Sequence, residues 1–274
     1  MKFNSFSFLF SASLFAIVMS FSACHEHDDE LTGTGSLEIE FDHLAGGQTL
    51  ELGKSYTNAA GEAMSFSEFK YYVSNFSLVK SDGSVFTVPK DDCYFLISEK
   101  ADGKNGTVKI DNIPAGDYKE FRFIIGVDSL KSVSPAAERT GVLDPAGEGA
   151  GMYWAWNSGY IFVKVEGESP AAPLDSVAGT RRFRYHIGLF GGFSAPTLNN
   201  IKSVSLSDAH GDVAKVRNSD HHAPHLHLYV DVLEMFTGPN NISVATNPTV
   251  MASPFSKNLA DNYQDMFVLD HIHN

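Results

Sequence analysis

Hydrophobic and polar positions alternate along much of the chain after residue 35. Leu37, Ile39 and Phe41 alternate with acidic residues up to His43. A period of two places apolar side chains on one face of a β-strand and polar side chains on the other. Strands with this pattern, or with a short apolar run, are also predicted at 69–80, 85–88, 94–98, 107–110, 118–127, 160–165, 181–188, 201–207, 225–233 and 267–273.

Turn signals separate the predicted strands. Asp82-Gly83, Asp102-Gly103 and the segment 113–116 each fall between two such runs, and glycine-containing dipeptides of this kind favour tight turns. Helix is expected only as a turn or two within 129–139 and within 258–265. Because no internal repeat or linker divides residues 35–274, we predict an all-β fold, a single antiparallel β-sandwich with a few short helices.

The N-terminal segment predicts export. Residues 1–23 carry one charged residue, Lys2, and an apolar region at 8–21 before Cys24, which is typical of a secretory signal peptide. The ending Phe21-Ser22-Ala23-Cys24 resembles a bacterial lipobox, in which the cysteine becomes diacylated; an ordinary signal peptide that meets a cysteine is the alternative. Residues 24–34 would be a flexible tether, and its acidic start resembles the signal for surface lipoproteins in Bacteroidetes-type bacteria. We therefore expect an outer-membrane protein, facing the periplasm or the cell surface, whose only membrane contact is its lipid anchor.

Charge and motif content exclude several functions. The 274 residues have a formal net charge of -13, from 33 acidic and 20 basic residues, and the basic residues gather only at 181–184. Nucleic acid is therefore not an expected partner. The sequence has no nucleophile elbow, phosphate-binding loop, HExxH or CxxC motif, so no familiar catalytic motif marks it as an enzyme.

Histidines are the main candidate ligands. They gather in one run, His221, His222, His225 and His227, and in the terminal pair His271 and His273, while His43 and His186 lie at the ends of predicted strands. A His-x-His pair on a strand points both imidazoles the same way, and neutral imidazole suits zinc, copper, iron and nickel. The alternative is a polar strand face without a metal.

Both tryptophans of the chain lie in one segment, residues 151–167. Trp154 and Trp156 are two positions apart, so in an extended segment they share a face, with Ala155 on the other. An apolar strand follows directly from Tyr160. Two buried core aromatics and a functional pair at the mouth of a strand are both compatible with this spacing.

Several of these segments together resemble the MbnP-like copper-binding proteins, exported β-rich proteins that are often lipoproteins. The resemblance rests on 69–75, 126–129, 152–160 with Glu166-Gly167, Tyr185-His186-Ile187-Gly188, and the terminal His271-Ile272-His273. It implies copper as the ligand and, as partner, a di-haem enzyme of the MauG-like peroxidase family, which oxidises a tryptophan to kynurenine before histidines help to bind the copper. Trp154 and Trp156 are the candidate substrates, and the protein itself is expected not to be an enzyme.

Under this interpretation, His43, His186, His271 and His273 lie on one rim of the sandwich around a single copper ion, for storage, acquisition or delivery. His221, His222, His225 and His227 form a second, weaker candidate site, which becomes the better one if the other histidines occupy opposite rims. Two other functions remain open. One is a zinc-dependent enzyme with His-x-His pairs and Asp231 or Glu234 as base, and the other is a carbohydrate-binding or adhesive sandwich that presents both tryptophans as a stacking platform.

Overall fold

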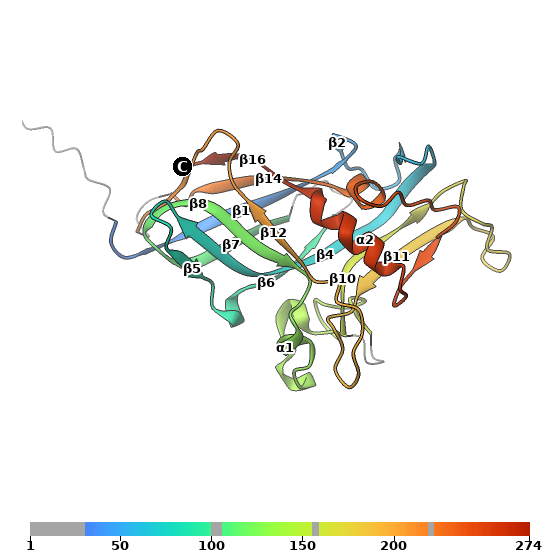
Figure 1. The fold of residues 1–274 in the computed structure, drawn as a ribbon, viewed down its shortest axis with the longest axis horizontal. Helices are drawn as coiled ribbons and strands as arrows, with labels where there is room; N and C mark the ends of the chain where they lie inside the picture. Colours follow the sequence, from blue (N-terminus) through green and yellow to red (C-terminus); the bar gives the residue numbers. More distant parts are fainter. Residues whose placement is uncertain (1–30, 100–105, 155–158, 219–221) are drawn as a thin grey trace, which may run out of the picture. The chain divides into compact units, whose positions relative to one another are not determined.

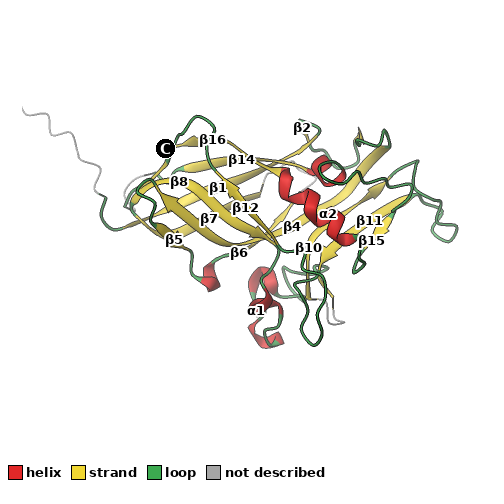
Figure 2. Cartoon of the chain, viewed as in Figure 1, coloured by secondary structure: helices red, strands yellow, loops and turns green. Residues whose placement is uncertain are grey.

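Two β-sheets carry most of the regular structure, and short helices lie beside them (Figure 2). The computed structural model describes residues 31–99, 106–154, 159–218 and 222–274. Residues 31–274 form one compact unit. The expected signal peptide, Cys24 and its lipid lie outside the described residues, as do Trp156 and His221. Within the described residues no helix is both long and apolar enough to cross a membrane.

The smaller sheet places the C-terminal strand one strand away from the first one, with a single strand between them (Figure 1). Its strands, in spatial order, are β16 (Phe267–His273), β14 (His225–Asp231), β1 (Thr34–Ala45) and β2 (Gln48–Thr49), with β7 (Gly106–Pro114) also paired to β1. Burial alternates along β1 as the sequence predicts: Leu37, Ile39, Phe41 and His43 are buried, and the acidic residues between them face outward. His43 therefore belongs to the core-facing side of this sheet.

The larger sheet contains the Trp154 segment. Its main path is β12 (Lys202–Leu206), β8 (Gly116–Ile125), β4 (Ala63–Lys80), β10 (Gly159–Glu168), β11 (Arg182–Gly188) and β15 (Thr249–Val250). Short strands pair along it: β3 (Ser55–Thr57), β5 (Val85–Thr87), β6 (Tyr94–Ser98), β9 (Tyr153–Trp154) and β13 (Ala214–Val216). The helices are α1 (Ser129–Ser132), α2 (Ser256–Tyr263) and the 3-10 turns η1 (Lys90–Asp92), η2 (Ala136–Glu138), η3 (Gly141–Leu143), η4 (Val232–Phe236) and η5 (Gln264–Met266).

The two sheets enclose an aromatic core. Phe41 of the smaller sheet meets Tyr71 and Phe123 of the larger one edge to face, with ring centroids 6.2 and 6.4 Å apart. Phe267 of β16 lies 5.6 Å from Tyr71 and 5.3 Å from Phe123. Edge-to-face pairs at these distances are favourable beyond the area that they bury. The predicted all-β sandwich is confirmed.

Strand direction adds one feature that the pattern did not predict. Most pairs are antiparallel, but β1 pairs in parallel with β14, and β11 with β15. Residues 46–224 separate β1 from β14, so no hairpin fixes their relative direction. The parallel pair places Glu40 opposite His227, and Asp42 opposite Tyr229, so acidic residues of β1 line the histidines of β14.

A β-bulge in β16 reverses the facing of its last residues. His227 pairs with His271 while the next residue of β14, Leu228, pairs with Leu269, so Asp270 is the extra residue. A bulge shifts the alternation by one position. Leu269 is buried in the core, whereas Asp270 and His271 are both partly exposed. Asp270 and His271 consequently stand side by side on the outer face.

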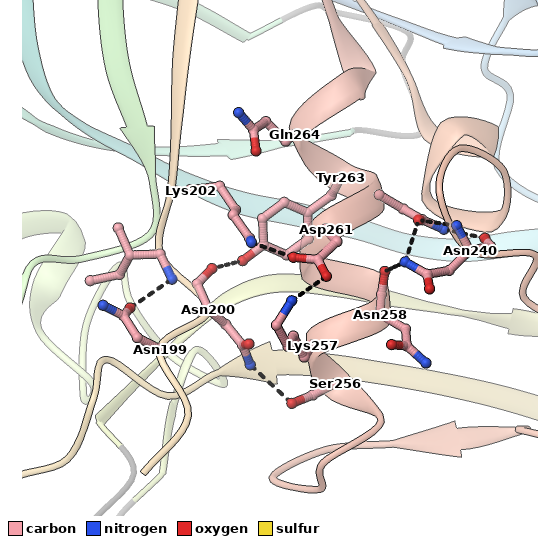
Figure 3. Close-up of polar contacts among 12 residues, drawn as sticks. Asn199, Asn200, Lys202, Asn240, Ser256, Lys257, Asn258, Asp261, Tyr263 and Gln264 are labelled. Atoms are coloured by element: carbon pink, nitrogen blue, oxygen red, sulfur yellow. Dashed lines mark hydrogen bonds and ion pairs between the residues drawn. The ribbon is translucent and has the colours of Figure 1, made fainter. Parts of the chain in front are cut away.

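Polar contacts fasten α2 just before β16 begins (Figure 3). Asp261 of α2 is bound by Lys202 of β12 and by Lys257, and the buried Tyr263 hydroxyl donates to the Asn200 carbonyl. Ser256 accepts a 2.9 Å hydrogen bond from the Asn200 amide. Burial disfavours ionised Asp261, but the bonds from the two lysines outweigh it and lower its pKa. These contacts fix where β16 starts along the sheet.

Candidate metal site

Histidines and one aspartate gather on the outer face of the smaller sheet. The His227 and His271 rings stack, with centroids 4.9 Å apart, because their residues are register partners in β14 and β16. The Asp270 Oδ2 atom lies 3.2 Å from His227 Nδ1 and 2.6 Å from His271 Nδ1. Ligand atoms of these three residues all lie within 4.8 Å of one another, a spacing that one metal ion could bridge. We call these three residues the sheet-face triad.

Further side chains surround the sheet-face triad. His271 Nε2 lies 2.9 Å from His273 Nε2, and His227 Nε2 lies 3.6 Å from the Asp42 carboxylate. His225 Nε2 lies 3.3 Å from the Glu40 carboxylate. Carboxylates that lie beside the second ring nitrogen are the usual outer partners of metal-ligating imidazoles.

The electrostatic field of this face favours cations. Burial opposes ionisation of Asp270, but hydrogen bonds from His271 and His227 outweigh it and lower the pKa of the Asp270 carboxyl. The Asp270 charge in turn raises the pKa of the neighbouring Tyr229. Together with Glu40 and Asp42, Asp270 makes this histidine-rich face anionic.

His43 is a core residue with both ring nitrogens bonded. Its Nδ1 lies 2.7 Å from the Glu99 carboxylate, and its Nε2 lies 2.9 Å from the Tyr71 hydroxyl. The His43 and Glu99 side chains are 0 and 3% exposed, and burial, followed by the Glu99 charge, raises the Tyr71 pKa. A metal ion could reach His43 only by displacing one of these partners.

His186 lies on the outer face of the larger sheet. Phe69, Val165 and Tyr185 are register partners that face the core, and His43 packs against Phe69 with ring centroids 5.0 Å apart. His186 follows Tyr185 in β11, so its side chain points the other way. There, Nε2 lies 2.7 Å from Glu166 Oε1. The structure thus places His43 and His186 on opposite faces of this sheet.

The Trp154 indole packs against the strand that carries His186. A Cβ atom at Gly188 would stand 2.8 Å from Trp154 Cζ3 and 2.4 Å from the Tyr160 carbonyl oxygen, so only glycine fits there. Gly188 is two residues after His186, on the same face and about 7 Å along the strand. Trp154 itself is 8% exposed. We call Trp154, Gly188, His186 and Glu166 the tryptophan face.

The predicted ligands therefore separate into three places instead of sharing one rim. His43 lies in the core, His186 lies at the tryptophan face, and His271 and His273 lie at the sheet-face triad. The second predicted group joins the terminal pair, because His227 and His225 are register partners of His271 and His273. His222 is exposed in the segment before β14.

Sequence reasoning missed the carboxylates that complete these places. Glu99 is an ordinary acidic residue in the sequence, and Glu166 belongs to the family resemblance but had no role assigned to it. Pairing between distant strands is what brings them to His43 and His186. Asp270 adjoins His271 in the sequence, and strand alternation predicts that neighbours face opposite ways. Only the bulge, which the sequence does not reveal, puts both side chains on the outer face. The sequence could have predicted that His43 faces the core, because His43 continues the alternation of the core-facing residues Leu37, Ile39 and Phe41.

Comparison with known proteins supports the fold and the family. The sequence model of the MbnP family matches residues 34–252. Among solved structures, the chain is similar to MbnP from Methylosinus trichosporium, with a TM-score of 0.51 and 22% identity over 76% of this chain and 79% of that one. This likeness shows a shared fold. No curated protein matches the chain.

Proposed function

Because the chain belongs to the MbnP family, we propose that it is a copper-binding protein for copper storage, acquisition or delivery, and that it is not itself an enzyme. We place the copper at the tryptophan face, which lies entirely within the matched residues 34–252. The observation that carries this proposal is the packing of Trp154 on Gly188, two residues from His186 in the same strand.

Local backbone strain sets this place apart. Leu189, the residue after Gly188, has a φ of 77°, a left-handed conformation that is costly for a residue with a branched side chain. The buried Asn200 side chain holds the turn by donating to the Gly188 carbonyl at 2.8 Å, and the Asn200 backbone donates to the Leu189 carbonyl at 2.8 Å. Strain of this kind persists where the surroundings enforce it, and it clusters at functional sites.

The residues of the tryptophan face fit a copper ligand set in part. Glu166 binds His186 Nε2, as carboxylates do when they orient a metal-ligating imidazole, and Nδ1 is then the ligand atom. An intact indole nitrogen is a donor only and ligates poorly. Opening the Trp154 or Trp156 ring to kynurenine supplies an aromatic amine and a ketone, so we propose a di-haem enzyme of the MauG type as the partner that oxidises the tryptophan.

For location, we propose an outer-membrane lipoprotein anchored through Cys24. Its test is Cys24→Ala. The variant should leave the membrane fraction, because dual acyl chains are enough for stable anchoring. Continued membrane association with unchanged processing would contradict the anchor.

Two other functions receive less support from the geometry. Trp154 is 8% exposed, so it cannot serve as a sugar-stacking platform in this conformation. Asp231 accepts hydrogen bonds from the backbone of Gly46, Gly47 and Leu233, so its carboxylate caps a turn and is poorly placed as a catalytic base. Glu234 is partly buried, and burial raises its pKa, but within the described residues it belongs to no candidate metal cluster.

The test combines mass and metal content. The protein is produced with and without a di-haem partner enzyme, and peptides spanning 151–167 are mapped by mass spectrometry. We expect a defined mass increase on Trp154 or Trp156 only with the partner, together with retained copper. An unmodified segment in a protein that nevertheless retains copper would contradict the role of the tryptophan.

A further inference from the structure

The sheet-face triad lies partly outside residues 34–252, which the family model matches. The family match ends at residue 252, whereas Asp270 and His271 belong to β16, which begins at Phe267. The triad and the tryptophan face also lie on different sheets, on strands β14 and β16 as opposed to β10 and β11. The triad is therefore a different place in the fold from the one at which copper is proposed above.

We infer that the sheet-face triad is a second metal site, in which His227 Nδ1, Asp270 Oδ2 and His271 Nδ1 bind one divalent transition-metal ion. The two Nδ1 atoms already converge on the same carboxylate oxygen, at 3.2 and 2.6 Å. Without an ion, protons on these nitrogens satisfy the carboxylate. A divalent cation takes the place of those protons, since ligation requires neutral imidazole and ionised carboxylate.

Outer partners select the ligating nitrogen of each ring. His271 Nε2 lies 2.9 Å from His273 Nε2, so once Nδ1 gives up its proton to bind the ion, the remaining proton sits on Nε2 and is donated to His273. His227 Nε2 lies 3.6 Å from the Asp42 carboxylate, which favours a proton on that nitrogen. A hydrogen-bonded outer partner such as His273 fixes the tautomer and orientation of a metal-ligating histidine in this way, whereas Asp42, at 3.6 Å, acts on His227 through its charge. His273 and Asp42 are thus positioning residues.

The donor set and the exposure define the metal class. Two imidazoles and a carboxylate suit zinc, copper(II), nickel or cobalt(II), whereas soft thiolates, which select copper(I), are not among the ligands of the cluster within the described residues. The His271 and Asp270 side chains are 43 and 34% exposed. Three protein ligands leave a fourth position for water, so the ion should exchange with solution.

Cobalt(II) tests this inference because its visible spectrum reports the ligand geometry independently of any copper at the tryptophan face. Purified full-length protein is titrated with cobalt(II), and metal content is measured in parallel with zinc(II). We expect one equivalent of cobalt to give the absorption of a four- or five-coordinate site. Zinc should displace it, because the same donor set binds zinc more tightly.

Variants separate this site from other histidines. His227→Gln and Asp270→Asn should each weaken cobalt binding at least tenfold, while the exposed control His222→Ala should bind like the wild type. His186→Ala should also leave the cobalt spectrum unchanged, which distinguishes this site from the tryptophan face. Circular dichroism checks that each variant is folded. Absence of a cobalt spectrum in the wild type, or wild-type affinity in His227→Gln and Asp270→Asn, would overturn the inference.

Discussion

The tryptophan face and the sheet-face triad are alike in chemistry and opposite in environment. Both pair a histidine with a carboxylate on an outward sheet face. The first is covered: Trp154 is 8% exposed, and Gly188 is held against it. The second is open at His271 and Asp270, which are 43 and 34% exposed, while its His227, at 15%, is as buried as His186, at 14%. A covered site favours retention of an ion, and an open one favours exchange.

The two regions also differ in what the fold needs to form them. The tryptophan face lies within residues 34–252, matched by the family, and it depends on one glycine and one strained residue. The sheet-face triad needs only strand alternation, a β-bulge and a terminal strand that the family match does not include. The two regions are therefore built on different strands and can be varied separately by substitution.

The largest expected effect belongs to His43, a histidine in neither region. In His43→Ala the buried Glu99 carboxylate and the Tyr71 hydroxyl both lose their hydrogen-bond partner, and leaving a buried polar group unsatisfied costs about 1 to 3 kcal/mol for each group. Urea denaturation should show this loss of unfolding free energy, while copper and cobalt binding by the folded fraction stay at wild-type levels. Selective loss of copper from well-folded His43→Ala would instead make His43 a ligand.

The next effect tests how tightly the tryptophan face is packed. Gly188→Ala forces a Cβ to within 2.4 Å of a backbone oxygen and 2.8 Å of the Trp154 ring, and overpacking of this kind costs about 1 to 3 kcal/mol. Cobalt binding at the sheet-face triad should persist in the folded variant.

A matched control for Gly188 is Gly179, which has open space around it and a φ of 67°. Gly179→Ala carries only the strain of its left-handed backbone, about 1 kcal/mol. Equal stabilities of the two variants, compared by urea denaturation, would contradict the packing of Trp154 on Gly188.

A smaller effect concerns the charges beside His186. Lys164 and Lys70 both bind Glu68, and although burial opposes its ionisation, their hydrogen bonds lower the Glu68 pKa below its ordinary value of 4.5. A lowered pKa adds stability above pH 4.5 that disappears as the pH falls through the folded-state pKa. Glu68→Gln should therefore destabilise the protein by about 1 kcal/mol at pH 7.

The pH dependence supplies the check on Glu68. The stability difference between wild type and Glu68→Gln should shrink below pH 4.5, when measured by urea denaturation at several pH values. Glu168→Gln is the control, because Glu168 is 59% exposed and its ion pair with Arg182 spans 3.7 Å. A difference that stays constant with pH would show that Glu68 does not act through its charge.

Alternation predicted most of the fold, because a buried face imposes a period of two on each strand. Alternation did not predict which distant strands pair, so the parallel pairing of β1 with β14 was missed. It also missed short strands such as β13 and β15, which are too short to leave a pattern in the sequence. The candidate metal ligands were likewise predictable only in part. Residue type identified the histidines, but which of them meet depends on register, and the bulge at Asp270 is decided by packing between strands.

The most direct test of copper at the tryptophan face is the copper that survives a chelator wash, compared between His186→Ala and His227→Ala, with each protein produced together with a di-haem partner enzyme. The wild type and His227→Ala should each retain one copper ion per chain, because the retained ion is held at the covered face, and folded His186→Ala should retain none. Retention by His186→Ala with loss from His227→Ala would place the copper at the sheet-face triad and contradict the account.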